Sequence, residues 1–158
     1  MKISAQGVEV IKRYEGVEGK PYRCPAHLWT IGVGHVMYPA QAKLKLEDRM
    51  AIPLKPEDDR TYSKEETDGI LCADLVRFEQ GVNQLVTTNL TQGMFDSLVS
   101  FSFNLGLGTL QRSTLRQKLN RNQKQEAAQE FLKYSKAAGR VLRGLLLRRQ
   151  AELLLFLS

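Results

Sequence analysis

The segment from Tyr14 to His35, YEGVEGKPYRCPAHLWTIGVGH, contains a glutamate, a cysteine and a threonine that could do chemistry together. Glu15, Cys24 and Thr30 follow the spacing E-x8-C-x5-T. A carboxyl group that keeps its proton can protonate a leaving oxygen, as in glycoside hydrolysis, and a thiolate can activate water or attack carbon. The three residues are therefore a candidate catalytic set.

Glu15 and Cys24 each allow a plainer interpretation. Glu15 is expected at the C-terminal end of a helix, where the helix dipole disfavours a carboxylate and so favours the protonated form. Most acids at helix ends are nevertheless inert surface groups. A thiol with an ordinary pKa of about 8.5 is mostly protonated at neutral pH, and Cys24 could simply pack beneath the neighbouring strands. These residues alone leave both alternatives open.

The residues around this set predict a short helix followed by a small β segment. Ser4 is a suitable N-cap for a helix that ends at Gly16. Residues 19–38 combine glycines and a proline with aromatic and β-branched residues, which predicts a small, twisted hairpin region. Residues 39–61 are charged and interrupted by prolines, so we expect a surface loop with at most a short helical turn.

The remainder of the chain predicts helices. Ser63 and Glu66 can form a capping box at the start of a long helix that reaches Leu85. After Thr91, a run that is apolar on nearly all sides predicts a central buried helix. The other expected helices begin at Ser113 or Thr114, span residues 123–136, and span residues 144–157.

These elements predict a single domain, because 158 residues is the length of one domain. Its fold class is α+β and predominantly helical. We expect a small β-hairpin lobe at about residues 16–62 and a larger helical lobe formed by residues 1–15 and 63–158, with no separate second domain.

The composition narrows the classes of partner. The net charge of +6 favours a polyanionic partner, such as nucleic acid, anionic lipid or an acidic cell-wall polymer. No nucleic-acid-binding motif is present, so nucleic acid is not expected as a partner. The two cysteines are expected as free thiols, and no clustered metal ligands or phosphate-binding loop are present. We therefore expect no metal and no cofactor.

Three separated motifs resemble one known family. The E-x8-C-x5-T spacing together with TIGVGH resembles the active site of phage lysozymes of glycoside hydrolase family 24, the T-even phage lysozyme family. The run SFSFNLGLGTLQRSTLRQKLN is similar to the central helix and following loop of that family, and AAGRVLRGLLLRRQAELLLFL is similar to its C-terminal signature. The resemblance extends over most of the chain and implies a two-lobe lysozyme-like fold.

The resemblance implies a muramidase that hydrolyses the β-1,4 bond between N-acetylmuramic acid and N-acetylglucosamine in bacterial peptidoglycan. Glu15 would be the general acid, and Thr30 would help to hold the attacking water or the sugar. Cys24 occupies the place that most often holds Asp, so it could act as base, as nucleophile or as a bystander. A lytic transglycosylase acting on the same substrate is the alternative reaction.

The resemblance also implies supporting residues. Arg148 would pair with Glu15, although Arg148 and Arg149 could instead be solvated surface groups of the last helix. His35 and Asp74 would form a pair that ties the β lobe to the long helix. The implied lining of the substrate cleft comprises Val36, Phe103, Asn104, Ser113 and Thr114, and Phe103 could equally be a core residue.

The family further implies a partner and a location. Peptidoglycan would be the substrate of a monomeric enzyme that accumulates in the host cytoplasm and reaches the wall through a holin. This fits the expectation that the N-terminus is no signal peptide and that no segment spans a membrane. The basic, apolar C-terminal helix could also make transient contact with an anionic membrane, although packing in the core is its ordinary role.

Overall fold

Local caps define the first helix where the sequence predicts it. Helix α1 (Ala5–Glu15) begins after Ser4, whose Oγ accepts a hydrogen bond from the Gly7 N–H at 3.3 Å. Gly16 follows the helix with a φ of 78°, a left-handed conformation that favours glycine and ends the helix. The N-terminal prediction is confirmed.

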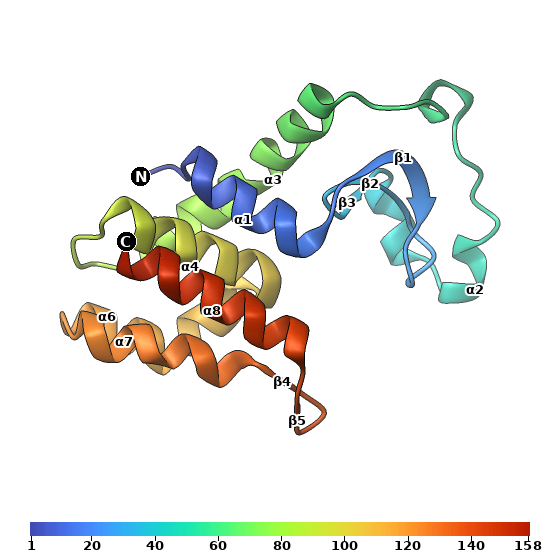
Figure 1. Cartoon of the computed structure of the whole chain (residues 1–158). Coiled ribbons are helices and arrows are strands. Elements are labelled where there is room, and N and C mark those ends of the chain that lie inside the picture. Colours follow the sequence, from blue (N-terminus) through green and yellow to red (C-terminus); the bar gives the residue numbers. More distant parts are fainter. The chain divides into compact units, whose positions relative to one another are not determined.

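The computed structural model describes residues 1–158, which divide into two compact units (Figure 1). The smaller unit is Glu15–Asp74. The larger unit combines Met1–Tyr14 with Leu75–Ser158. Helix α3 (Lys64–Leu85) contributes to both units, because the division falls between Asp74 and Leu75.

The smaller unit is built on a three-stranded antiparallel sheet with the order β1-β2-β3. Its strands are β1 (Glu18–Arg23), β2 (Trp29–Gly32) and β3 (His35–Val36). The turn between β2 and β3 contains Gly34 with a φ of 67°. The sheet confirms the hairpin region that the sequence predicts at residues 19–38.

The segment after the sheet contains more structure than the sequence predicts. It forms the 3-10 helices η1 (Pro39–Lys43) and η2 (Pro56–Asp58) and the short helix α2 (Leu46–Arg49). Both 3-10 helices carry a proline at their first position, where the missing N–H costs nothing. The expectation of at most one short turn is therefore wrong.

Arg23 ties this segment to the sheet. Its guanidinium lies over the Trp29 ring at 4.4 Å and donates hydrogen bonds to four backbone carbonyl oxygens, which belong to His27, Arg49, Met50 and Ile52. The Trp29 indole N–H also donates to Ile52, at 3.0 Å. These carbonyls would otherwise need water, so a single side chain satisfies three carbonyl groups of this segment and one of the preceding turn.

The capping box at the start of α3 is confirmed. The Glu66 N–H donates to Ser63 Oγ at 3.1 Å, and the Ser63 N–H donates to Glu66 Oε1 at 3.2 Å. The Arg60 guanidinium beside Glu66, helped by the Ser63 N–H, lowers the pKa of Glu66 to about 2. The Glu66 carboxylate is therefore ionised at neutral pH, where it accepts the hydrogen bond of the capping box.

The larger unit is helical and has α4 (Gln92–Leu105) at its centre (Figure 1). Thr91 caps α4 by accepting a hydrogen bond from the Met94 N–H, and nine of the residues of α4 are buried. The remaining elements are α5 (Leu107–Arg112), α6 (Thr114–Asn120), α7 (Lys124–Glu130), η3 (Phe131–Tyr134), β4 (Lys136–Ala137), β5 (Arg140–Val141) and α8 (Arg143–Leu157).

Close packing of α4 against α8 forms the core of the larger unit. Phe101 and Phe156 each pack edge-on against Phe131, with ring centroids 5.6 Å and 5.5 Å apart. Gly93 lets the two helices approach, because a Cβ atom at this position would lie 2.2 Å from the carbonyl oxygen of Leu155. No helix of the structure combines the length and the apolar character needed to cross a membrane.

Two elements of the larger unit differ from the prediction. The helix expected over 123–136 ends earlier, and β4 and β5 form a hairpin whose turn residues Ala138 and Gly139 have φ values of 50° and 77°. Two positive φ values are typical of a tight hairpin turn and are incompatible with a continuing helix. Helix α5, which follows Gly106, was not predicted either.

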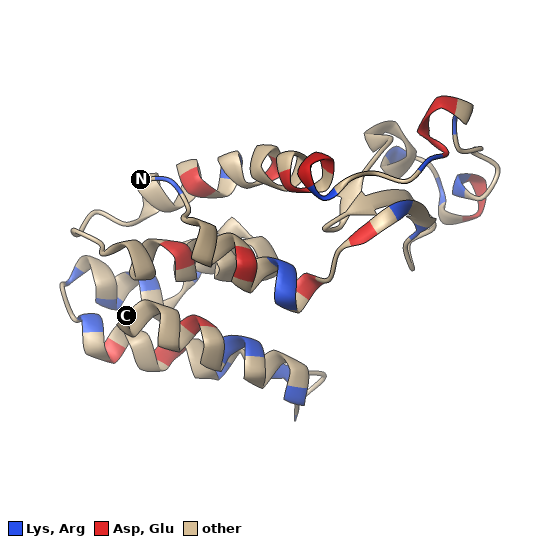
Figure 2. Cartoon of the chain, turned by 45° about the horizontal axis from the view of Figure 1, so that its top comes forward, with Lys and Arg blue, Asp and Glu red and all other residues tan.

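Positive charge is concentrated near the C-terminus of the sequence. Eleven of the 23 Lys and Arg residues lie in residues 112–149, where Glu126 and Glu130 are the only acids. Figure 2 shows these blue segments on the helices of the larger unit. The net charge of the whole chain, +6, is smaller than the charge of this segment alone, because acids predominate elsewhere.

Candidate active site

Thr30 lies on β2, and Cys24 directly follows β1 in the smaller unit. Cys24 continues the pairing of β1 with β2, since its N–H donates to the Leu28 carbonyl oxygen at 3.0 Å. Thr30 is buried, and its Oγ1 donates to the same carbonyl oxygen at 2.9 Å. The intervening turn is closed by the His27 N–H, which donates to the Cys24 carbonyl at 2.8 Å.

The surroundings of Cys24 favour its thiolate. Partial burial of the thiol opposes ionisation, but backbone hydrogen bonds from Leu28 and Ala26 and a side-chain hydrogen bond with Thr30 stabilise the charged form. The net effect lowers the pKa of Cys24 below its ordinary value. Both cysteines are free thiols in the structure, and Cys24 is the less exposed of the two.

Thr30 can serve only one acceptor at a time, because a hydroxyl carries one proton. In the structure this proton is donated to the Leu28 carbonyl oxygen. Ionisation of Cys24 requires the Thr30 proton to turn toward the sulfur. The hydroxyl therefore follows the protonation state of the thiol.

Tyr22 is a further candidate site residue that the sequence did not predict. It pairs with Thr30 across β1 and β2 and precedes Cys24 by two residues, so the three side chains lie on one face of the sheet. Burial raises the pKa of Tyr22, and the negative charges of Glu18, Cys24 and Glu15 raise it further. The phenol therefore keeps its proton. The alternating spacing Tyr22-x-Cys24 in a predicted strand is the signal that could have found it.

Glu15 is the last residue of α1 and belongs to the smaller unit together with Cys24 and Thr30. Its side chain is exposed, so a large solute can reach the carboxyl group. Its charge is one of those that raise the pKa of Tyr22. The charges of Glu15 and Cys24 therefore both act on the Tyr22 phenol.

His35 and Asp74 form the expected pair. His35 Nδ1, on β3, lies 2.8 Å from Asp74 Oδ2, on α3. About a third of each side chain is exposed (35% and 32%), so the pair is fixed but open to water. This contact joins the edge of the sheet to the part of α3 that belongs to the same unit.

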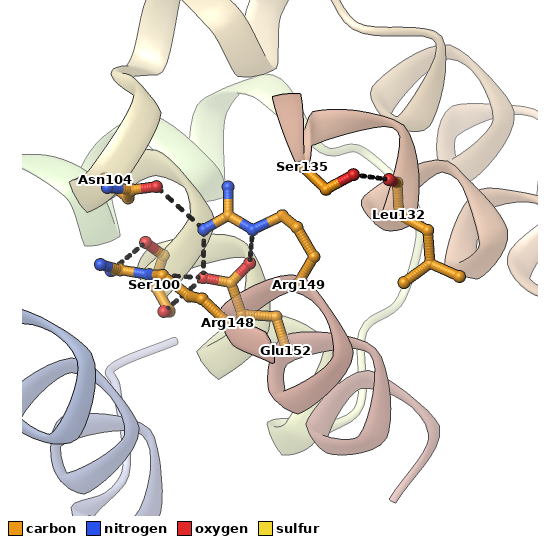
Figure 3. Close-up of polar contacts among 7 residues, drawn as sticks. All are labelled: Ser100, Asn104, Leu132, Ser135, Arg148, Arg149 and Glu152. Carbon is orange, nitrogen blue, oxygen red and sulfur yellow. Dashed lines mark hydrogen bonds and ion pairs between the residues drawn. The ribbon is translucent and has the colours of Figure 1, made fainter. Parts of the chain in front are cut away.

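In the larger unit, Arg148, Arg149 and Glu152 form a buried cluster (Figure 3). Glu152 Oε1 accepts hydrogen bonds from Arg148 Nε at 3.2 Å, from Arg149 Nη2 at 3.0 Å and from Ser100 Oγ at 2.7 Å. Arg149 Nε lies 2.8 Å from Glu152 Oε2. The alternative that Arg148 and Arg149 are solvated surface groups is wrong, because both are buried.

Burial and charge act against each other at Glu152. Desolvation raises its pKa, while Arg149, Ser100 and Arg148 counteract part of that effect, and the net direction is upward. Sequence analysis did not single out Glu152 as a site residue. The spacing of Arg148, Arg149 and Glu152, three and four residues apart on one helix face, is the signal for such a cluster. The pairing of Arg148 with Glu15 stays a prediction.

The expected cleft residues have different surroundings. Val36 lies on the edge strand β3 and is partly exposed, and Thr114 is exposed at the start of α6. Phe103 is partly exposed and packs edge-on against Phe78 at 5.4 Å. Ser113 is buried and caps α6, since its Oγ accepts from the Arg116 N–H at 3.0 Å. Its hydroxyl proton goes to the Leu110 carbonyl, so Ser113 already has two protein partners.

Comparison with known proteins identifies the family. The sequence profile described as phage lysozyme matches residues 12–152. The chain belongs to the phage lysozyme family. The matched range includes Glu15, Cys24, Thr30 and the buried cluster of α8, so the candidate site lies within the part of the chain that defines a phage lysozyme.

Individual phage lysozyme relatives extend over the whole chain. The endolysin of Bacillus phage B103 is 38% identical over 163 residues, which cover 100% of this chain and 55% of the relative. The chain thus spans about half the length of the Bacillus phage endolysins that it matches. The endolysin of Salmonella phage P22 is 34% identical over 158 residues, which cover 100% of this chain and 99% of the relative.

Solved structures confirm the predicted fold class. The crystal structure of a P22 lysozyme mutant is 32% identical and superposes with a TM-score of 0.82 over 100% of this chain and 99% of that chain. The muramidase domain of SpmX from Asticaccaulis excentricus is 34% identical, with a TM-score of 0.79 over 99% of this chain and 98% of that domain. The fold is the lysozyme-like, predominantly helical α+β fold.

Proposed function

We propose that this chain is an endolysin that hydrolyses the β-1,4 bond between N-acetylmuramic acid and N-acetylglucosamine in bacterial peptidoglycan. The observation that carries the proposal is the position of Cys24 beside Leu28, Ala26 and Thr30, whose hydrogen bonds lower the pKa of the thiol at the position implied for the water-activating group. Membership in the phage lysozyme family and the names of the relatives support the substrate.

In the proposed reaction, Glu15 donates its proton to the leaving oxygen as the bond from the anomeric carbon to that oxygen breaks. A water oxygen bonds to the anomeric carbon, and a proton of that water passes to the Cys24 thiolate. Thr30 holds the water or the sugar through its hydroxyl oxygen, which can accept a hydrogen bond while its own proton is donated to the Leu28 carbonyl. Exchange with solvent then restores both groups.

The remaining implied residues have supporting roles in this proposal. Arg148 pairs with Glu15 and orients it, and His35 with Asp74 keeps β3 against α3. Val36, Phe103, Asn104 and Thr114 line the path of the glycan, and Ser113 supports it through the cap of α6. Peptidoglycan is the partner of a monomer that acts on the wall after a holin has opened the inner membrane.

The decisive experiment compares Glu15→Gln with the wild type in a turbidity assay on purified peptidoglycan. Loss of a general acid costs about 10²–10⁴-fold in rate, so we expect activity to fall at least a hundredfold. Glu9→Gln is the matched control, because Glu9 is an exposed acid on the same helix and its removal changes the charge equally. Equal activity of Glu15→Gln and Glu9→Gln would refute the assignment.

The products of the same assay distinguish hydrolysis from the alternative reaction. Hydrolysis leaves reducing ends, whereas a lytic transglycosylase leaves 1,6-anhydro-muramic ends, which mass spectrometry separates. A thiol in place of the commoner carboxylate is the observation that makes this alternative worth testing. Anhydro products would show that no water attacks the anomeric carbon, and they would leave Glu15 as the group that protonates the leaving oxygen.

A further inference from the structure

The side chain of Asn104 is held from one side by the buried cluster of α8. Arg149 Nη2 donates to Asn104 Oδ1 at 3.0 Å and to Glu152 Oε1 at 3.0 Å (Figure 3). Arg149 and Glu152 are both fully buried, and Arg149 also lies over the Phe101 ring at 5.3 Å. Asn104 itself is only partly buried, in the last turn of α4.

The chemistry of Arg149 fixes the orientation of the Asn104 amide. A guanidinium group only donates hydrogen bonds, so the group that faces it must be the amide oxygen. The two N–H groups of Asn104 Nδ2 therefore point away from the cluster. The structure contains no hydrogen bond from Nδ2 to another residue, so this donor is available to a ligand.

Arg149 is itself held in place by Glu152. Glu152 contacts Arg149 through both carboxylate oxygens, at 3.0 Å from Nη2 and 2.8 Å from Nε. One hydrogen bond and one close ion-pair contact with a fully buried carboxylate restrict the position of the guanidinium. The hydrogen bond from Arg149 then keeps Asn104 Oδ1 facing the cluster and disfavours a flip of the amide group.

We propose that Arg149, held by Glu152, is a positioning residue that presents Asn104 Nδ2 as a hydrogen-bond donor to an acceptor oxygen of the glycan strand. The inference rests on the proposed function for the identity of the glycan. N-acetylated sugars carry hydroxyl and acetamido oxygens, which are acceptors that an amide N–H can recognise. Preorganisation of the donor improves binding, because no rotamer needs to be fixed when the sugar arrives.

The first test measures glycan binding without catalysis. The probe is a peptidoglycan tetrasaccharide titrated by calorimetry into the Glu15→Gln protein and into its derivatives. Asn104→Asp keeps an acceptor for Arg149 and removes both donors, so we expect Kd to rise about tenfold, as for the loss of one good hydrogen bond. Asn89→Asp is the control, because Asn89 is exposed in the loop before α4 and acquires the same charge.

The second test asks whether Arg149 acts through Asn104. Arg149→Lys retains a positive charge for Glu152 but replaces the planar, two-sided donor with a single ammonium group. We expect it to raise Kd for the tetrasaccharide by itself and to add nothing in the Asn104→Asp background. A purely structural Arg149 would raise Kd equally in both backgrounds, and that result would overturn the proposal.

The two proposals fail in different ways. Equal Kd values for Asn104→Asp and Asn89→Asp would overturn the role of Asn104, even if the wild type cleaves peptidoglycan. Conversely, a wild type that releases no new sugar ends but loses tetrasaccharide affinity on Asn104→Asp would refute the reaction and retain the binding role. Thermal unfolding of Asn104→Asp checks the fold, and we expect an unchanged or higher Tm because its carboxylate can pair with Arg149.

Discussion

At the scale of single residues, the Cys24 thiol combines a lowered pKa with partial exposure. The hydrogen bonds from Leu28, Ala26 and Thr30 outweigh the desolvation that opposes the thiolate. Alkylation by iodoacetamide requires the thiolate, so its rate should rise with pH around a midpoint below that of the same thiol in the unfolded chain. Below that midpoint the sulfur is protonated and alkylation slows. The measurement is the rate against pH in a Cys72→Ser background, which removes the exposed second thiol.

The control for this prediction is Thr30→Val, which keeps the shape and removes the hydroxyl. The midpoint should shift upward, because the thiolate loses one of its donors. The same protein unfolded in urea gives the reference value for a solvated thiol. A folded midpoint equal to that reference would contradict the lowered pKa.

At the scale of elements, the contact between α4 and α8 depends on Gly93. A Cβ atom at this position would lie 2.2 Å from the Leu155 carbonyl oxygen and 2.5 Å from Ser158 Oγ, and backbone cannot yield as a side chain does. Gly93→Ala should therefore lower the free energy of unfolding by about 2 kcal/mol, as overpacking typically does. Urea denaturation with the slope checked against the wild type measures this change.

The matched control at this scale is Gly69→Ala. Gly69 is an exposed glycine inside α3, and no atom lies within 4 Å of the position where a Cβ would stand. Alanine is the better helix former, so this variant should gain about 0.5–1 kcal/mol. If both alanines shifted stability in the same direction, close packing of α4 on α8 would not be the cause.

At the scale of the whole molecule, charge is distributed unevenly along the sequence. The basic segment, residues 112–149, carries eleven cations and two acids. Peptidoglycan carries carboxylates, and exposed charges are screened beyond about 8–10 Å near physiological salt. Activity on peptidoglycan should therefore fall several-fold when salt is raised from low to high concentration. Initial rates of turbidity loss across a salt series measure this dependence.

Charge reversal locates the effect. Lys136→Glu with Arg140→Glu changes two exposed cations of the β4–β5 hairpin, which lies in the basic segment. Lys43→Glu with Lys45→Glu makes the same change of charge at two exposed residues of the smaller unit. The first pair should flatten the salt dependence more than the second. Equal effects would mean that net charge, rather than the basic segment, draws the protein to the wall.

Much of the fold could be predicted because the signals are local. The caps at Ser4 and Ser63 act within three residues, and Gly16 ends α1 through its own backbone conformation. The short helices η1, α2 and η2 were harder to predict, because segments of three to five residues are too short for a helical hydrophobic period. The end of α2 is held by Arg23, which satisfies the carbonyl groups of Arg49, Met50 and Ile52, up to 29 residues away.

The candidate site was predictable only in part. Glu15, Cys24 and Thr30 could be proposed because their spacing lies within one short segment of the sequence. Tyr22 was missed, because its role depends on the strand register that sets it opposite Thr30. Glu152 was missed as well, since its partner Ser100 lies 52 residues earlier in the chain.

The sequence by itself determined the helical caps, the strand segment at residues 19–38, the family and the spacing of three candidate catalytic residues. Only the tertiary structure decided that Thr30 and the loop backbone favour the Cys24 thiolate, and that Arg149 holds Asn104 across 45 residues of chain. The reason is physical: helix and turn preferences act between near neighbours, whereas the ionisation of a thiol and the direction of a buried hydrogen bond depend on groups that packing brings together.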